Sequence, residues 1–248
     1  MFSFWKPKKV SPAGNWGFLH TDIHSHILPG IDDGAASLQD SLNLIGAMQG
    51  QGFSKMVATP HISEDIYPNS RGTILRQRDA LRGALKNQGI HFPVEAAAEY
   101  MIDASFLSLV SAAERLLTLD GGNGNKVLVE MSYLSESPYL AQALFALQTQ
   151  AYQPVLAHPE RYNFYHDRLE KYDELLEKGC LFQLNTISLS GYYGKHVQKT
   201  AVYLLRKKMY HYCGSDIHHL RHTRVLSNML HDPVLNELES YGFKNREL

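Results

Sequence analysis

Short β-rich runs alternate with helical patterns along the whole of this 248-residue sequence, and a polar motif follows each run. Strands that alternate with helices favour a parallel sheet with right-handed crossover connections. Seven such units predict an α/β fold in which the strands form a closed or nearly closed barrel. The runs cover residues 18–23, 55–59, 93–98, 126–129, 154–157, 180–184 and 209–213.

The chain is expected to contain one domain, because no segment of biased composition divides it. Hydrophobic residues make up 44% of the sequence and charged residues 20%, so a large core can form. We therefore predict a single barrel domain over residues 18–248, preceded by an N-terminal extension over residues 1–17.

Capping signals mark the starts of two expected helices. Ser37 with Asp40 three residues later is typical of a capping box, and Gly52 suits the following C-terminal stop. Ser137 as N-cap with Pro138 at the first helical position predicts the other start. A basic helix is expected over residues 71–87. The inner stripes expected on the two capped helices are Leu38, Leu42 and Ile45, and Leu140, Leu144, Leu147 and Ala151.

Nine imidazole and carboxylate side chains lie just after these runs or close to their ends. The carboxyl ends of parallel barrel strands share one face, so residues far apart in sequence would converge there. Imidazole and carboxylate ligands suit zinc, iron and manganese. The nine candidate metal ligands are His24, His26, Asp33, His61, Glu99, Glu130, His158, Asp216 and His218.

Their spacing supports a metal site. His24 and His26, one residue apart at an extended strand end, project toward the same side, and Asp216 and His218 repeat that spacing. A carboxylate such as Glu99 could bridge two metals about 4 Å apart, as in two-metal hydrolases. The alternative for Glu99 and Glu130 is a structural pair with arginine or lysine. The other eight histidines are expected to be ordinary surface or core residues: His20, His91, His166, His196, His211, His219, His222 and His231.

Several function classes are excluded by composition and motif. The formal net charge of −1 leaves no global basic field for nucleic acid. Cys180 and Cys213 form no disulfide framework and begin no C-x5-R phosphate loop, which excludes a conventional cysteine-based phosphatase. A Walker A loop and a dinucleotide-binding G-x-G-x-x-G fingerprint are also missing.

The location expected for the protein is the cytoplasm. Apolar runs are too short to span a bilayer, and the N-terminal residues have the wrong order of charge and apolarity for a signal peptide. Aromatic residues beside three lysines in this terminus could contact an anionic membrane surface. An ordinary terminus is the preferred interpretation, because three lysines fall below the usual basic cluster.

The motifs DIHSH, IDDG, ATPH, AAAEY, VLVEMS, AHPERY and GSDIH occur in this order. Together they resemble the PHP (polymerase and histidinol phosphatase) superfamily, and most closely its bacterial tyrosine phosphatases of capsule and exopolysaccharide operons. The resemblance covers about residues 18–240. Carboxylates at both Asp33 and Glu130, where many other relatives have histidine, indicate this branch.

The resemblance implies a distorted (β/α)7 barrel with three divalent metal ions, manganese being preferred over iron or zinc. Asp32 is the alternative to Asp33 as a ligand. The first metal would be bound by His24, His26, Glu99 and Asp216, the second by Glu99, Glu130 and His158, and the third by Asp33, His61 and His218.

Arginines are expected to bind the phosphate. Arg161 matches the phosphate-binding arginine of the family, and a planar guanidinium can donate two hydrogen bonds to phosphate oxygens. A second arginine is expected after SDIH, where Arg221 and Arg224 both qualify. The implied reaction is hydrolysis of phosphotyrosine by metal-activated water, without a covalent phosphoenzyme.

Three alternatives to a tyrosine phosphatase remain at this point. They are another phosphomonoesterase such as a histidinol phosphatase, an exonuclease-like domain, and a non-catalytic scaffold that binds a kinase. The near-neutral charge disfavours the exonuclease, and the complete ligand set disfavours the scaffold. The resemblance implies a membrane-anchored bacterial tyrosine autokinase as substrate, and hence a peripheral position at the inner face of the membrane as an alternative location. Assembly into a homo-oligomer is left open.

Overall fold

A computed structural model of the protein describes residues 14–121 and 124–248. Every pair of neighbouring strands within its two sheets is parallel. One sheet has the order β1 (Thr21–Ser25), β2 (Lys55–Ala58) and β4 (Val94–Ala96). The other has the order β3 (His61–Ile62), β5 (Glu99–Met101), β6 (Lys126–Glu130), β7 (Gln153–Ala157), β8 (Leu181–Asn185) and β9 (Tyr212–Gly214).

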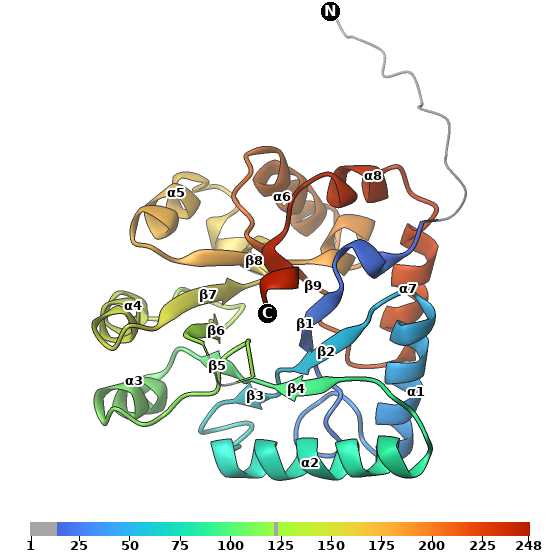
Figure 1. The fold of residues 1–248 in the computed structure, drawn as a ribbon. Coiled ribbons are helices and arrows are strands. Elements are labelled where there is room, and N and C mark those ends of the chain that lie inside the picture. The colour runs from blue at the N-terminus through green and yellow to red at the C-terminus, as the bar shows by residue number, and fades with distance from the viewer. Residues whose placement is uncertain (1–13, 122–123) are drawn as a thin grey trace, which may run out of the picture.

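Helices surround the strands on the outside (Figure 1). They are α1 (Leu38–Gly50), α2 (Arg71–Asn87), α3 (Ala104–Ser111), α4 (Leu140–Thr149), α5 (Glu170–Glu177), α6 (Lys195–Arg206), α7 (Leu220–Met229) and α8 (Val234–Glu239). The predicted alternation of strands and helices is therefore confirmed. Within the described residues, no helix is long and apolar enough to cross a membrane.

Hydrogen bonds connect the two sheets at both margins. At one margin the pairing of β2 with β4 continues into the other sheet: the amide of Ala97 donates to the carbonyl of Ala58 over 2.8 Å, and the amide of Glu99 in β5 donates to the carbonyl of Pro60 over 3.1 Å. At the other margin the amide of Asp216 donates to the carbonyl of His24 over 2.8 Å, and the amide of His26 donates to Ile217 over 2.9 Å. The chain just after β9 thus pairs with the end of β1.

The helix starts follow the capping signals only in part. Ser37 and Asp40 form a complete capping box at α1. The helix α2 has the bounds predicted for the basic helix, residues 71–87. The predicted start at Ser137 is wrong, because α4 begins at Leu140. The Ser137 hydroxyl donates to the carbonyl of Ile102 over 2.6 Å and accepts from the amide of Tyr139 over 3.2 Å, so it ties this loop to the end of β5.

Two residues assigned to the inner stripes lie outside them. Ala151 follows α4 with a φ of 61° and is exposed, and Leu38 is 41% exposed at the start of α1. The third predicted run also differs, because it is interrupted between β4 and β5. Glu99 therefore begins β5 rather than following a strand.

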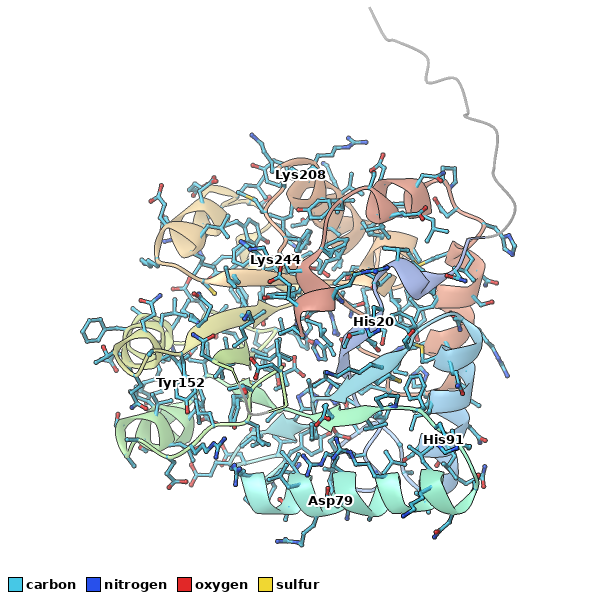
Figure 2. All side chains as sticks on the ribbon, in the orientation of Figure 1. His20, Asp79, His91, Tyr152, Lys208 and Lys244 are labelled. Atoms are coloured by element: carbon cyan, nitrogen blue, oxygen red, sulfur yellow. The ribbon has the colours of Figure 1, made fainter. Side chains whose placement is uncertain are left out.

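Strand side chains alternate between two apolar clusters. Val127 and Val129 of β6 belong to the large cluster that also contains buried residues of the helices, whereas Leu128 belongs to a smaller one. The smaller cluster includes Val57 and Val155 from other strands, and Leu248 packs against it. Figure 2 shows side chains filling the spaces between strands and helices.

The C-terminal segment covers the amino ends of the strands. The Asn245 side chain donates to the carbonyl of Thr21 over 2.8 Å, and its oxygen accepts from the amide of Cys213 over 3.0 Å. Figure 1 shows the C-terminus at the centre of the view, in front of the strands. The opposite ends of the strands are therefore the ends where a site can form.

Candidate metal centre

The inner face of the strands changes from apolar to acidic at their carboxyl ends. Leu128 and Glu130 are two residues apart on β6, and Ala97 and Glu99 have the same spacing, so each pair shares one face. Leu128 and Ala97 belong to the smaller apolar cluster, while Glu99 and Glu130 are buried beyond it. Both carboxylates consequently point inward from neighbouring strands.

Backbone geometry at two other strand ends is unusual. His158 after β7 has a φ of 32°, and Asp216 after β9 has a φ of 52°, both in the left-handed region that L-residues rarely adopt. Non-glycine residues in this region cost about 1–3 kcal/mol and cluster at functional sites. Both side chains are buried, and the turns direct them into the same cluster as Glu99.

Glu99 lies at the centre of the cluster. Its Oε2 atom is 3.2 Å from Nε2 of His24 and 3.4 Å from Nε2 of His26. The same oxygen is 3.1 Å from Nδ1 of His61, while Oε1 is 2.9 Å from Nε2 of His158. One carboxylate therefore contacts four imidazoles from three segments of the chain.

All nine predicted ligands come together in four overlapping groups of ligand atoms within 4.8 Å of one another. The second predicted set is divided between two groups, because Glu130 groups with His61 and Glu99, whereas His158 groups with His24 and Glu99. The four groups are His26, Asp33, His61 and His218; His24, His26 and Asp216; His24, Glu99 and His158; and His61, Glu99 and Glu130.

The two aspartates of the IDDG motif have different surroundings. Oδ1 of Asp33 lies 3.4 Å from Nε2 of His61 and 3.4 Å from Nε2 of His218. Asp32 instead accepts a hydrogen bond of 2.8 Å from Nδ1 of His26, on the side of the ring away from the cluster. The geometry thus favours Asp33 as a ligand and Asp32 as the residue that orients His26.

Other polar residues support the cluster from behind, and the sequence did not single them out as functional. Oε1 of Gln183 is 2.8 Å from Nδ1 of His24, which leaves Nε2 of that ring facing Glu99. Asn185 donates to Oδ2 of Asp216 over 2.8 Å. Metal-binding histidines usually make such a second contact, which fixes the ring orientation.

The residues present fit a cation. Oε2 of Glu99 is fully buried and has no hydrogen-bond partner among the described residues, although three imidazole nitrogens surround it. The facing Nε2 atoms of His24 and His26 are 3.3 Å apart. Two imidazole nitrogens and a buried carboxylate oxygen that point at one another form a donor set that divalent transition metals prefer.

The imidazoles of the metal-free chain differ in their protonation. Burial lowers the pKa of His24, His26 and His61, but the nearby carboxylates outweigh this effect and raise it, so a metal would replace protons on these rings. Burial lowers the pKa of His158 to about 4, and the contact with Glu99 offsets this only in part. A neutral imidazole is the form that binds metal. Burial raises the pKa of Glu99, but the charges of His24 and His61 outweigh that effect and hold its pKa well below the usual range.

Arg161 lies at the edge of the cluster, in the short turn after His158. One guanidinium nitrogen, Nη1, donates to Oδ2 of Asp216 over 2.8 Å. The guanidinium carbon lies 4.5 Å from the centre of the Tyr133 ring and 4.2 Å from that of the Tyr193 ring. The two aromatic faces therefore hold the cation beside the predicted ligands.

Comparison with known proteins agrees with this architecture. The family "Capsular polysaccharide synthesis, CpsB/CapC" matches residues 20–229. The chain belongs to the CpsB/CapC family. It is 30% identical to tyrosine-protein phosphatase YwqE of Bacillus subtilis over 92% of this chain and 90% of that protein. It is 28% identical to tyrosine-protein phosphatase CpsB of Streptococcus agalactiae serotype III over 80% of this chain and 83% of that one.

The fold of this CpsB/CapC chain is also similar to a solved structure. The match has a TM-score of 0.77 and 28% identity, and it covers 92% of this chain and 90% of the other. That structure comes from work on YwqE from Bacillus subtilis and CpsB from Streptococcus pneumoniae, which are described as metal-dependent tyrosine phosphatases.

The two arginines expected after the last motif differ from Arg161 in position. Arg221 and Arg224 lie on α7 of this CpsB/CapC chain, and both are exposed. Neither forms an ion pair with the cluster within the described residues. The buried face of α7 instead presents His222, whose Nδ1 accepts from the amide of His218 over 3.3 Å.

Neither cysteine of this CpsB/CapC chain is available as a nucleophile. Cys180 and Cys213 are both buried, and burial raises the pKa of the Cys180 thiol to about 12. The remaining histidines belong to none of the four ligand groups, although His222 contacts His218. Two of them, His20 and His91, precede β1 and β4 and are labelled in Figure 2; they lie toward the amino ends of the strands, opposite to the cluster.

Proposed function

We propose that this chain is a metal-dependent protein-tyrosine phosphatase. The observation that carries the proposal is the convergence of nine imidazole and carboxylate ligands with a guanidinium at their edge. Metal ligands can supply a nucleophile, and the arginine can bind a phosphate. The activities of YwqE and CpsB support the same reaction for this chain.

The nine ligands would hold three divalent metal ions, with manganese preferred over iron or zinc. Glu99 would bridge two of the ions, since its two oxygens face different groups of imidazoles. Bound metals supply a hydroxide at neutral pH and neutralise charge on the phosphoryl oxygens.

The residues of the chain position the substrate. Arg161 would donate to the non-bridging phosphoryl oxygens, where charge develops during displacement. The rings of Tyr133 and Tyr193 restrict the guanidinium, so little conformational freedom is lost on binding. Arg221 or Arg224 would supply a second cationic contact to the substrate. A tyrosine phenolate leaves readily, because the pKa of its conjugate acid is about 10.

The architecture proposed for this site is one domain over residues 18–248, a distorted (β/α)7 barrel. Two observations support the barrel. The hydrogen bonds between β2 and β4 continue into those between β3 and β5, and the residues that follow β9 pair with the end of β1. The nine short strands would then form a barrel of seven strands, because β2 continues into β3 and β4 continues into β5.

The proposed substrate is a phosphotyrosine protein of capsule or exopolysaccharide synthesis, namely a membrane-anchored tyrosine autokinase. The family description, capsular polysaccharide synthesis, supports this class of substrate. The enzyme would act in the cytoplasm, or at the inner face of the membrane if its substrate is anchored there.

A comparison of substrates tests the function. The manganese-loaded protein should hydrolyse a phosphotyrosine peptide with a kcat/KM at least about 100-fold above that for histidinol phosphate or a phosphoserine peptide, since both alkoxides are poorer leaving groups than a phenolate. Phosphate release would be measured under identical conditions for all three. A preference for histidinol phosphate would contradict the proposal and assign the chain to another activity.

A further inference from the structure

A cavity of about 470 Å³ opens directly beside the candidate metal centre. His61 and Glu130, two of the predicted ligands, form one end of it. The rest lies between the loop after β3 and the loop after β6, strands that flank β5 in the sheet (Figure 1). We call this cavity the flank groove, because it lies at the flank of the metal centre. A peptide bound at the metal centre could extend into it.

The walls of the flank groove are largely apolar and include exposed side chains. Met101 and Met131 line it, and Tyr67 stacks on the ring of His61 at a centroid distance of 5.3 Å. Ile66 is 66% exposed at its edge. Large apolar side chains at the surface beside a cavity are typical of a site that binds another molecule.

Exposed apolar residues concentrate on this face of the molecule. Seven large apolar side chains are exposed among the described residues, and six of them follow the carboxyl ends of strands, where the metal centre lies. The six are Leu38, Ile66, Tyr133, Leu134, Tyr192 and Leu220. The face is therefore shaped to contact something larger than a free phosphate ester.

The charge of the flank groove has one sign. Asp65, Asp103 and Glu136 line it, and no lysine or arginine does so within the described residues. Asp103 caps α3, and Glu136 accepts a hydrogen bond of 2.7 Å from the Tyr165 hydroxyl. Asp65 is exposed and forms no ion pair with any described residue, so its charge is free to interact with a ligand.

We propose that the flank groove binds the residues next to the phosphotyrosine of a peptide substrate and selects basic over acidic neighbours. This inference rests on the proposed phosphatase function and adds the determinant of its specificity. The apolar walls accept the stems of lysine or arginine side chains, whose charged ends reach the carboxylates at the rim. An acidic residue next to the phosphotyrosine would face the carboxylates of Asp65, Asp103 and Glu136, and no lysine or arginine among the described lining residues would compensate the repulsion.

The test uses the full chain loaded with manganese and three phosphotyrosine peptides. The peptides are identical except that the two residues on each side of the phosphotyrosine are lysine, glutamine or glutamate. Para-nitrophenyl phosphate, which has no neighbouring residues, serves as the fourth substrate. We expect kcat/KM for the lysine peptide to exceed that for the glutamate peptide by about tenfold at low salt, and less at high salt.

Asp65→Lys should reduce the ratio of the lysine to the glutamate peptide at least about threefold, with turnover of para-nitrophenyl phosphate unchanged. Glu239→Lys, an equal charge change on α8, is the matched control and should preserve the ratio. Ile66→Ser should raise KM for the lysine peptide without changing kcat, because it removes apolar contact alone.

Equal kcat/KM values for the three peptides in the wild type, or an unchanged ratio in Asp65→Lys, would overturn the inference. An equal effect of Glu239→Lys would overturn it too, because net charge rather than the flank groove would then set the preference. Failure of the proposed function has a different result: no hydrolysis of any peptide or of para-nitrophenyl phosphate by the metal-loaded wild type.

Discussion

The two carboxylate oxygens of Glu99 make the central contacts of the candidate metal centre. They contact four imidazoles from three segments of the chain, and one of these oxygens is buried without a hydrogen bond to any described residue. A buried carboxylate oxygen without a hydrogen bond is costly, and the charges of His24 and His61 offset that cost in the metal-free chain. A bound cation would contact the same oxygen directly, so metal binding should stabilise the folded chain.

Replacement of Arg161 should separate phosphate binding from metal binding. Guanidinium is a poor metal ligand, so Arg161→Ala should keep its metals and its fold. Its kcat/KM on a phosphotyrosine peptide should fall by about two to three orders of magnitude, the cost of losing one oxyanion donor. His158→Ala should lose metal occupancy together with activity. Elemental analysis would give the metal content of both variants, and peptide turnover would give their kcat/KM. Wild-type turnover by Arg161→Ala would show that Arg161 binds no substrate.

Asp32 offers a test of the residues behind the ligands. Asp32→Asn weakens the hydrogen bond that orients His26, so metal affinity should fall by about 10–100-fold while excess metal restores activity. Metal titration monitored by turnover would measure the shift. Asp79→Asn, a similar change on the exposed side of α2, should leave the titration unchanged. An unaltered metal affinity in Asp32→Asn would exclude the orienting role.

At the scale of elements, parallel strands that end at one face bring the ligands together. This arrangement was predictable, because polar motifs accompany every apolar run and parallel strands share their carboxyl ends. The supporting residues were not predictable, because Gln183 and Tyr193 carry no local signal that separates them from ordinary polar and aromatic residues. The start of α4 was mispredicted because the Ser137 hydroxyl serves a contact to Ile102, far away in sequence.

A glycine in β9 gives a prediction at this scale. A Cβ atom on Gly214 would lie 2.6 Å from Cβ of His24, so Gly214→Ala should displace that proposed ligand. We expect weaker metal binding and a loss of about 1–3 kcal/mol in the free energy of unfolding. Gly46→Ala, in the middle of α1 with open space around the new atom, should instead stabilise by about 0.5–1 kcal/mol. Denaturant unfolding compares the two, and equal metal binding by Gly214→Ala and wild type would contradict the close packing.

For the whole molecule, the two ends of the strands have separate tasks. The C-terminal segment closes the amino ends through Asn245 and Leu248, while the carboxyl ends carry the proposed ligands, Arg161 and the flank groove. The stabilising contacts and the proposed chemistry thereby lie on opposite faces, the division that parallel barrels also have. The CpsB/CapC family match over residues 20–229 contains all nine described strands and the predicted ligands, and it ends before the C-terminal segment.

The most direct test of the account is a metal titration of the intact protein. Manganese would be added stepwise to a sample shown by elemental analysis to be metal-free, with bound metal and phosphotyrosine-peptide turnover measured at each step. We predict no turnover at the start, activity that rises with bound metal, and loss of activity on adding chelator. Full activity in the verified metal-free sample would contradict the central claim that the clustered ligands hold catalytic metals.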